Sequence, residues 1–187
     1  MIYPKKINAN RGEMITKIAI ISSVLVAIIL IIINKLTTPQ IHWAAIANSG
    51  IIYIWIVVIY SVNKNVNIAG HVTVQTIAIS ALTVFIDYKL GFRGWSLSIS
   101  IPIIIIVANL AMLILTIVSH KKYLRYAIYQ LIILIFSILP IIFITEKLVT
   151  NPILGIIATG VSIINLLITV CLSAKDLKET IIRKFHI

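Results

Sequence analysis

The stretch DYKLGFRGWSLSISIP, residues 87–102, separates two long hydrophobic runs near the middle of the chain. The first run covers residues 68–86, and the second, residues 99–118, begins within the stretch. An α-helix rises about 1.5 Å per residue, so each run is long enough to cross a hydrocarbon core of roughly 30 Å. The stretch therefore predicts a loop that joins two transmembrane helices.

Similar runs lie on both sides of this pair. Sixty per cent of the 187 residues are hydrophobic and 11% are charged, which is more apolar surface than a water-soluble chain of this length can bury. We therefore predict an all-α integral membrane bundle of six transmembrane helices. The predicted spans are residues 18–33, 41–62, 68–86, 99–118, 126–144 and 152–172.

The first span, residues 18–33, follows a polar and basic segment, residues 1–17. A secretory signal peptide has a shorter apolar core, followed by small residues at a cleavage site. Here Asn34, Lys35 and Leu36 follow the run. We therefore expect an uncleaved first helix.

The distribution of basic residues predicts the orientation of the chain. Twelve of the 16 lysines and arginines lie in the two terminal segments and in the second and fourth loops, and four lie in the other loops. Short loops rich in these residues stay in the cytoplasm. We therefore expect both termini in the cytoplasm of a bacterium, the protein in its cytoplasmic (inner) membrane, and residues 87–102 on the extracytoplasmic side.

The net charge of +11 would favour nucleic acid as the partner of a soluble protein. Here the basic residues flank apolar spans, so we expect contact with the anionic inner leaflet and no nucleic acid. The C-terminal tail, residues 173–187, places Leu177, Ile181, Ile182 and Phe185 at helical spacing. This pattern suits an amphipathic helix on the membrane surface. The alternative is a continuation of the sixth helix into water.

Each predicted outer loop opens with the same dipeptide. If the dipeptide marks an internal repeat, the protein consists of three helical hairpins in series. Coincidence is the alternative, because lysine is common at helix ends, where its side chain reaches the membrane surface. The dipeptides are Lys35 and Leu36, Lys89 and Leu90, and Lys147 and Leu148.

The central loop concentrates the polar chemistry of the chain. Asp87 ends the third predicted helix, where its charge meets the negative end of the helix dipole, so we expect Lys89 or Arg93 to be its partner. Gly91 and Gly94 permit turns that other residues resist. Two interpretations of the aromatic residues are open, a binding platform or the aromatic belt found at bilayer surfaces. The candidate binding residues are Asp87, Tyr88, Arg93, Trp95 and Ser96.

Polar side chains inside the predicted spans are expected to hydrogen-bond between helices. In a permease or channel they would line a pathway instead, and Gln75, Asn109 and Asn165 are the candidates for either role. No aspartate, glutamate, lysine or arginine lies deep in a span, which disfavours an ion-coupled transporter. The full set is Asn48, His71, Gln75, Asn109, Gln130 and Asn165.

Catalytic arrangements find little support in the sequence. His71 and Asp87 lie 16 residues apart on one predicted helix, about 24 Å along its axis, so they do not share a site. His42, Asp87 and Ser96 form a triad by residue type only. No zinc-ligand spacing, haem motif or phosphate-binding loop is present, and the single cysteine, Cys171, allows no disulfide within the chain. We predict no enzyme activity, no metal and no cofactor.

Three segments resemble a family of uncharacterised bacterial membrane proteins, mostly from Gram-positive bacteria. They are IDYKLGFRGWSLSISIPIIIIVANLAMLI (residues 86–114), KKYLRYAIYQ (121–130) and IIRKFHI (181–187). The family has six hydrophobic helices, a loop with Asp, Gly and Trp-Ser after the third helix, and a basic-Phe-His ending. The matching positions are Asp87, Gly91, Gly94, Trp95, Ser96, Pro102, Asn109, Arg183, Phe185 and His186.

A short zinc ribbon typically precedes the helices in that family. Here no cysteine occurs before Cys171, so the ribbon is missing and we expect the membrane part to be the working unit. The family is a domain of unknown function. The resemblance therefore implies a fold and a topology and supplies no activity.

The preferred functional hypothesis is a non-enzymatic accessory, sensor or immunity-type protein. Its outer loop, residues 87–102, would recognise a peptide or a lipid, and its partner would be another membrane protein or a second copy of the chain. The alternative is a small oligomeric permease or channel. An intramembrane enzyme is a third hypothesis, which the spacing of the catalytic candidates disfavours.

Overall fold

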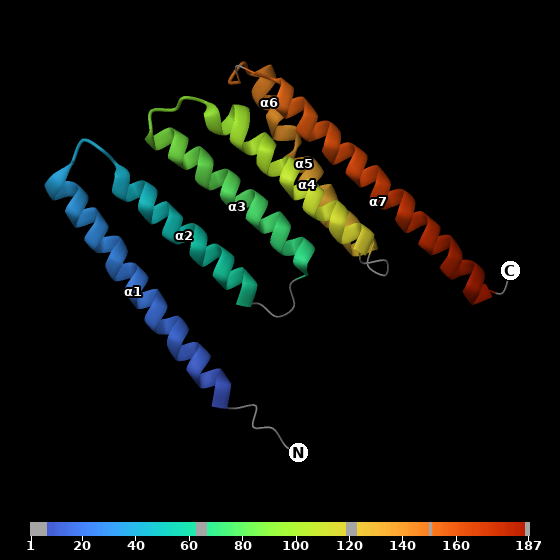
Figure 1. Cartoon of the computed structure of the whole chain (residues 1–187), viewed down its shortest axis with the longest axis horizontal. Coiled ribbons are helices and arrows are strands. Elements are labelled where there is room, and N and C mark those ends of the chain that lie inside the picture. Colours follow the sequence, from blue (N-terminus) through green and yellow to red (C-terminus); the bar gives the residue numbers. More distant parts are fainter. Residues whose placement is uncertain (1–6, 63–66, 119–122, 150, 186–187) are drawn as a thin grey trace. The chain divides into compact units, whose positions relative to one another are not determined.

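A computed structural model gives the fold of the chain (Figure 1). Every regular element in its described residues is a helix. The described backbone covers residues 7–62, 67–118, 123–149 and 151–185, and the described side chains cover residues 14–61, 67–118, 126–149 and 151–172.

Six helical segments in the described residues are long and apolar enough to cross a membrane, which confirms the predicted number. Two of them contain more than one helical element. The elements are α1 (Ile7–Thr37), α2 (Trp43–Val62), α3 (Ile68–Lys89), η1 (Ser96–Ser100), α4 (Ile101–Val118), α5 (Tyr123–Phe136), α6 (Ile138–Thr145) and α7 (Ile153–Phe185).

Two spans differ in detail from their predictions. The fourth begins at Ser96, three residues early, because the π-helical turn η1 precedes α4. The fifth is divided at Ser137 into α5 and α6. Pro140 explains the division, since proline has no amide to donate to the carbonyl of Phe136 and its ring crowds that carbonyl. The Ser137 carbonyl at the break accepts a hydrogen bond from the Thr159 hydroxyl of α7 at 2.7 Å.

The last helix, α7, runs without interruption from Ile153 to Phe185. The backbone of the tail therefore continues the helix of the sixth span. This agrees with the alternative interpretation, in which the sixth helix extends beyond the membrane. The tail's side chains, His186 and the basic residues Lys121, Lys122 and Arg125 lie outside the described side chains. Their contact with a membrane stays a prediction.

The chain divides into two compact units, and the first covers residues 1–54. It contains α1 and the first part of α2, joined by a turn that Asn34 organises. The Asn34 amide nitrogen donates to the carbonyls of Thr38 and Ile41, both at 2.7 Å, and its oxygen accepts the Ala44 amide at 3.0 Å. The most apolar stretch of α1 has no buried residue, so this helix presents apolar side chains on all its sides.

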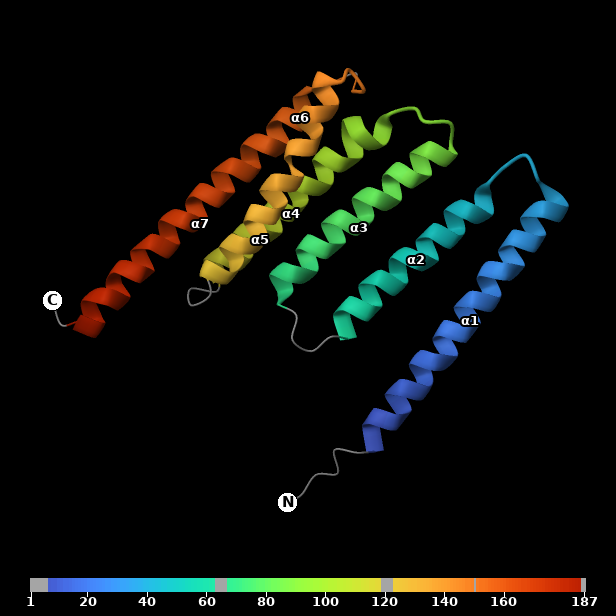
Figure 2. The same cartoon turned by 180° about the vertical axis from the view of Figure 1, so that it is seen from behind.

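The second unit, residues 55–187, contains the other four spans. Helix α4 contacts α3, α5 and α7, and α5 also contacts α3 and α7. Seen from either side, α4 and α5 lie alongside α7 (Figure 1, Figure 2). These four spans therefore form one bundle.

Helices α4 and α7 pack in parallel through matching seams. On each helix, five buried residues follow alternating steps of three and four, which is the spacing of a coiled coil. Hydrogen bonds cross the seam at a constant offset of 53 residues: Asn109 Nδ2 donates to Ser162 Oγ at 2.7 Å, and the hydroxyls of Thr116 and Thr169 lie 3.5 Å apart. The seam residues are Pro102, Ile105, Asn109, Met112 and Thr116 of α4, and Gly155, Ala158, Ser162, Asn165 and Thr169 of α7.

Candidate functional site: two loops at one end of the bundle

A buried carboxylate at the end of α3 holds the central loop. The Asp87 side chain is fully buried. Its Oδ1 accepts the Arg93 amide at 3.0 Å, and its Oδ2 accepts the amide and the hydroxyl of Ser96 at 3.2 and 2.8 Å. The carboxylate at the end of one helix therefore satisfies a donor at the start of the next, where amides lack partners within the helix.

The prediction that the charged side chain of Lys89 or Arg93 pairs with Asp87 is wrong. Arg93 contributes its backbone amide, and in the described part of the chain no basic side chain pairs with the carboxylate. The Lys89 ammonium lies over the rings of Phe85 and Tyr88, 5.5 and 5.6 Å from their centroids. Backbone amides and a hydroxyl satisfy an ionised carboxylate as well as a cation does.

Helix α3 ends in a Schellman motif. The Phe92 amide donates to the Asp87 carbonyl at 2.8 Å, and the Gly91 amide donates to the Tyr88 carbonyl at 3.3 Å. Gly91, with φ 94°, occupies the left-handed position that the motif requires. Phe92 and Gly94 follow with φ 46° and 74°. Left-handed backbone thus turns the chain sharply away from the helix.

Helix α6 ends in the same motif without a glycine. The Leu148 amide donates to the Phe143 carbonyl at 3.0 Å, and the Lys147 amide donates to the Ile144 carbonyl at 3.1 Å. Lys147 takes the left-handed position with φ 57°, which is less favourable for a residue with a side chain than for glycine. Among the described residues, positive φ angles are confined to these two loops.

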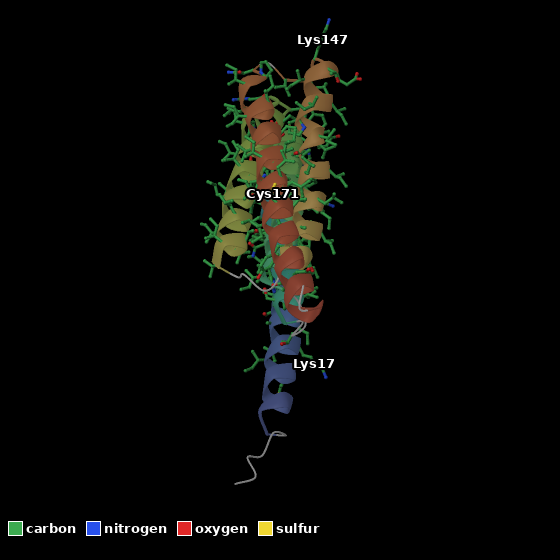
Figure 3. All side chains as sticks on the ribbon, turned by 90° about the vertical axis from the view of Figure 1, so that its right-hand side faces the viewer. Lys17, Lys147 and Cys171 are labelled. Carbon is green, nitrogen blue, oxygen red and sulfur yellow. The ribbon has the colours of Figure 1, made fainter. Side chains whose placement is uncertain are left out.

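The two loops lie side by side. A Cβ added to Gly94 would lie 3.6 Å from the Leu148 carbonyl oxygen, so the two backbones approach each other closely. Phe92 and Leu148 are 46% and 48% exposed, and Arg93 and Lys147 are exposed as well. Figure 3 shows the Lys147 side chain pointing away from the helix ends. We call the side chains of Phe92, Arg93, Lys147 and Leu148 the paired-loop surface.

The structure divides the five predicted binding residues into two groups. Asp87 and Ser96 are fully buried and hold the loop. Tyr88, 66% exposed, and Arg93 face outward, and Trp95 is half-buried. Two of the five residues are therefore available to a ligand at the surface, and a third is partly available.

Sequence analysis missed Lys147 and Leu148 as part of this site. Nothing in the sequence links these residues to the central loop, since Arg93 and Lys147 are 54 positions apart in the chain. One sequence feature could have drawn attention to this loop. No glycine occurs where α6 ends, although glycine is the usual residue at the left-handed position after a helix.

The repeated Lys-Leu dipeptide falls at three different structural positions. Lys35 lies inside α1, Lys89 is the last residue of α3, and Lys147 follows the end of α6. An internal repeat would place the dipeptide at equivalent positions. The dipeptide therefore does not mark one.

A second set of polar side chains lies inside the bundle. Asn165 Nδ2 donates to the carbonyl and side-chain oxygens of Asn109 at 2.8 and 3.2 Å, so both asparagines pack α7 against α4. Gln75 lies on an exposed face of α3 and does not belong to this interior. Gln130 of α5 does, since it is 2% exposed, and neither of its polar side-chain atoms has a hydrogen-bond partner in the described residues.

Three catalytic candidates of the second unit lie in different surroundings. His71 packs edge-on against Tyr60, with 5.0 Å between the ring centroids. The Ser96 hydroxyl donates to Asp87, and Cys171 is an exposed free thiol. No group of three or more histidine, cysteine or acidic side chains within the described ranges could hold a metal ion. The predicted lack of enzyme activity stays a prediction.

Six helices in the described residues that are long and apolar enough to cross a membrane indicate a multi-pass membrane protein. A model of a family of unknown function, DUF6320, matches residues 3–187, and the chain belongs to this family. The match confirms the resemblance to an uncharacterised family of domains. Neither a curated protein nor a solved structure matches the chain.

Proposed function

We propose that the protein is a non-enzymatic accessory, sensor or immunity-type membrane protein and that the paired-loop surface binds its ligand. The proposed location is the cytoplasmic membrane of a bacterium, with this surface on the extracytoplasmic side. The distribution of lysine and arginine along the chain supports that orientation. The basic tail and the cytoplasmic loops then face the anionic inner leaflet.

One observation carries the proposal: the left-handed residues gather in two loops that lie side by side and that expose both apolar and basic side chains. A left-handed residue with a side chain costs roughly 1–2 kcal/mol, and such strain gathers at ligand-binding and active sites. Phe92 and Lys147 are the two such residues among those described. A chain under selection for stability alone would favour glycine at both positions.

The hydrogen bonds of Asp87 add a second property, which is a loop shaped before any ligand arrives. A preorganised loop loses little conformational entropy on binding, so more of the contact energy appears as affinity. Phe92 adds a large, stiff side chain at the tip of that loop. These features suit recognition better than they suit a flexible linker between helices.

Native mass spectrometry on protein extracted gently from its host membrane tests the proposal. We expect the wild-type protein to retain a bound molecule that Phe92→Ala loses. Ile103→Ala is the matched control, because Ile103 is 45% exposed, like Phe92, but lies on α4. A wild-type protein without a bound molecule, or a molecule that Phe92→Ala retains, would contradict the proposal.

The bundle interior favours a second candidate, a small oligomeric permease or channel. Gln130, Ser80 and Asn165 each bury a polar atom without a hydrogen-bond partner in the described residues. Such atoms cost several kcal/mol in a membrane interior unless a polar solute or water meets them. In proteoliposomes, Gln130→Leu should slow the uptake of small polar solutes, and Gln75→Leu on the exposed face should not. Wild-type vesicles that move no solute would remove this candidate.

A further inference from the structure

The paired-loop surface has the chemistry of a phosphate site with an apolar border. Resting on the proposed function, we propose that its ligand is the headgroup of an anionic phospholipid. Arg93 and Lys147 hold the phosphate, and Phe92 and Leu148 contact the glycerol and the first carbons of the acyl chains. The proposal follows from the spacing, charge and membrane depth of these four residues.

The loop contact brings the two basic residues within reach of one anion. A Cβ added to Gly94 would lie 3.6 Å from the Leu148 carbonyl oxygen, Arg93 directly precedes Gly94, and Lys147 directly precedes Leu148. Consecutive Cα atoms lie about 3.8 Å apart, so the Cα atoms of Arg93 and Lys147 are separated by at most about 15 Å. Each extended side chain reaches roughly 6 Å from its Cα, and a phosphate adds oxygens on several sides. Both cations can therefore contact the same phosphate group.

The exposed charge at these loops favours an anion. Lys89 places its ammonium over the rings of Phe85 and Tyr88, and the Asp87 carboxylate is buried and hydrogen-bonded. Glu146 is the exposed acid of the two loops, against Arg93 and Lys147. Extracytoplasmic loops of membrane proteins usually carry few basic residues, so cations that outnumber acids at these two loops are unusual on the proposed outer side.

The position of the loops along the membrane normal favours a lipid as the source of the phosphate. The span that ends at Lys89 has 22 residues, a length of roughly 33 Å, which matches the hydrocarbon thickness. Residues just beyond its end lie at the depth of the headgroups. Each loop also pairs one basic side chain with one exposed apolar side chain, which suits a ligand that is anionic at one end and apolar at the other.

Tryptophan fluorescence of the full chain in a neutral detergent tests the proposal directly. Trp43→Phe and Trp55→Phe leave Trp95, which follows Gly94, as the reporter. We expect saturable binding of dihexanoyl phosphatidylglycerol, and binding at least tenfold weaker for dihexanoyl phosphatidylcholine and for inorganic phosphate. Arg93→Gln and Lys147→Gln should each weaken binding of the anionic lipid about tenfold, the size of one charge-assisted contact. Lys35→Gln, an exposed position in the last turn of α1, is the control that should change nothing.

Equal affinity for the two lipids, or no effect of Arg93→Gln and Lys147→Gln, would overturn the lipid assignment. Inorganic phosphate that binds as tightly as the anionic lipid would overturn the lipid as its source. The failure of this inference is distinct from that of the proposed function. If Phe92→Ala loses a bound molecule that Arg93→Gln and Lys147→Gln both retain, the result supports the paired-loop surface as the binding site and contradicts an anionic lipid as its ligand.

Discussion

The ends of α3 and α6 share one hydrogen-bond motif and differ in the residue at its left-handed position. At the end of α3 that residue is Gly91, which contributes backbone shape and no side chain. At the end of α6 it is Lys147, which contributes a cation at a position where glycine is more stable. The same turn therefore differs in what its left-handed residue contributes. At the end of α3 the residue contributes only backbone conformation. At the end of α6 it presents a charged side chain, at a cost in stability.

The loops that follow the two helices also differ in how they reach the next helix. Asp87, at the end of α3, accepts hydrogen bonds from the amide and the hydroxyl of Ser96, nine residues later. After α6, the next helix has a local cap, because Asn151 Oδ1 accepts the amide of Ile153, the first residue of α7, at 3.1 Å. The first loop is therefore held by hydrogen bonds between residues nine positions apart, which we call the long-range tie. The second is held by a hydrogen bond between residues two positions apart.

Asp87→Ala should have the largest effect, because it removes the long-range tie. The substitution leaves the buried hydroxyl of Ser96 and the Arg93 amide without their acceptor, and each such loss costs about 1–3 kcal/mol. We expect a loss of about 3 kcal/mol in the free energy of unfolding. The melting temperature, measured by tryptophan fluorescence in detergent, should then fall by about 6–12 °C. An unchanged melting temperature would contradict the role of Asp87 as the anchor.

Gly91→Ala should have the next largest effect, through backbone shape alone. Open space surrounds a Cβ at this position, but the φ of 94° is unfavourable for alanine. We expect a loss of about 1 kcal/mol and a melting temperature about 2–4 °C lower. Gly50→Ala is the control, since Gly50 also has open space around it and lies inside α2, where alanine is favoured. Equal effects at the two glycines would show that the left-handed turn contributes nothing.

Lys147→Gly should have the opposite sign, which sharpens the comparison most directly. Glycine relieves the left-handed strain, so we expect a gain of about 0.5–1 kcal/mol and a melting temperature about 1–4 °C higher. The same substitution should weaken binding of the anionic lipid about tenfold. A stability gain with a binding loss would establish that this residue serves the ligand. A lower melting temperature would mean that the lysine side chain stabilises the turn.

The helices could be predicted from the sequence, because a long apolar run determines a membrane span locally. The break at Ser137 and the π turn at Ser96 escaped prediction, although Pro140 was a visible cause of the first. The sequence predicted that Asp87 lies at the end of the third helix and has a partner, but it did not predict that Asp87 anchors the loop. Its place at the helix end is local, but its partners include backbone amides, which have no sequence signature.

The paired-loop surface could not be predicted, because it depends on the packing of two distant loops. The contact between Gly94 and Leu148 exists only once η1 and α6 lie together in the bundle. The seam between α4 and α7 was equally hidden, since its 3-4 steps run through glycine, alanine, serine, asparagine and threonine as well as apolar residues. In a membrane, small and polar residues pack helices, so a hydrophobic pattern does not reveal the seam.

Asn151→Ala should have the smallest effect of the series, because it removes a local and exposed cap. The Ile153 amide can turn to water when its acceptor is lost, so we expect a cost of about 0.5 kcal/mol and a fall of 1–2 °C in melting temperature. Asn151→Asp should recover this loss, since a carboxylate at a helix start also accepts the amide and interacts favourably with the helix dipole. Lipid affinity should be unchanged in both variants. If Asn151→Ala lowers the free energy of unfolding as much as Asp87→Ala does, the long-range hydrogen bonds of Asp87 stabilise the protein no more than the local cap does. The two loops would then differ only in Gly91 and Lys147.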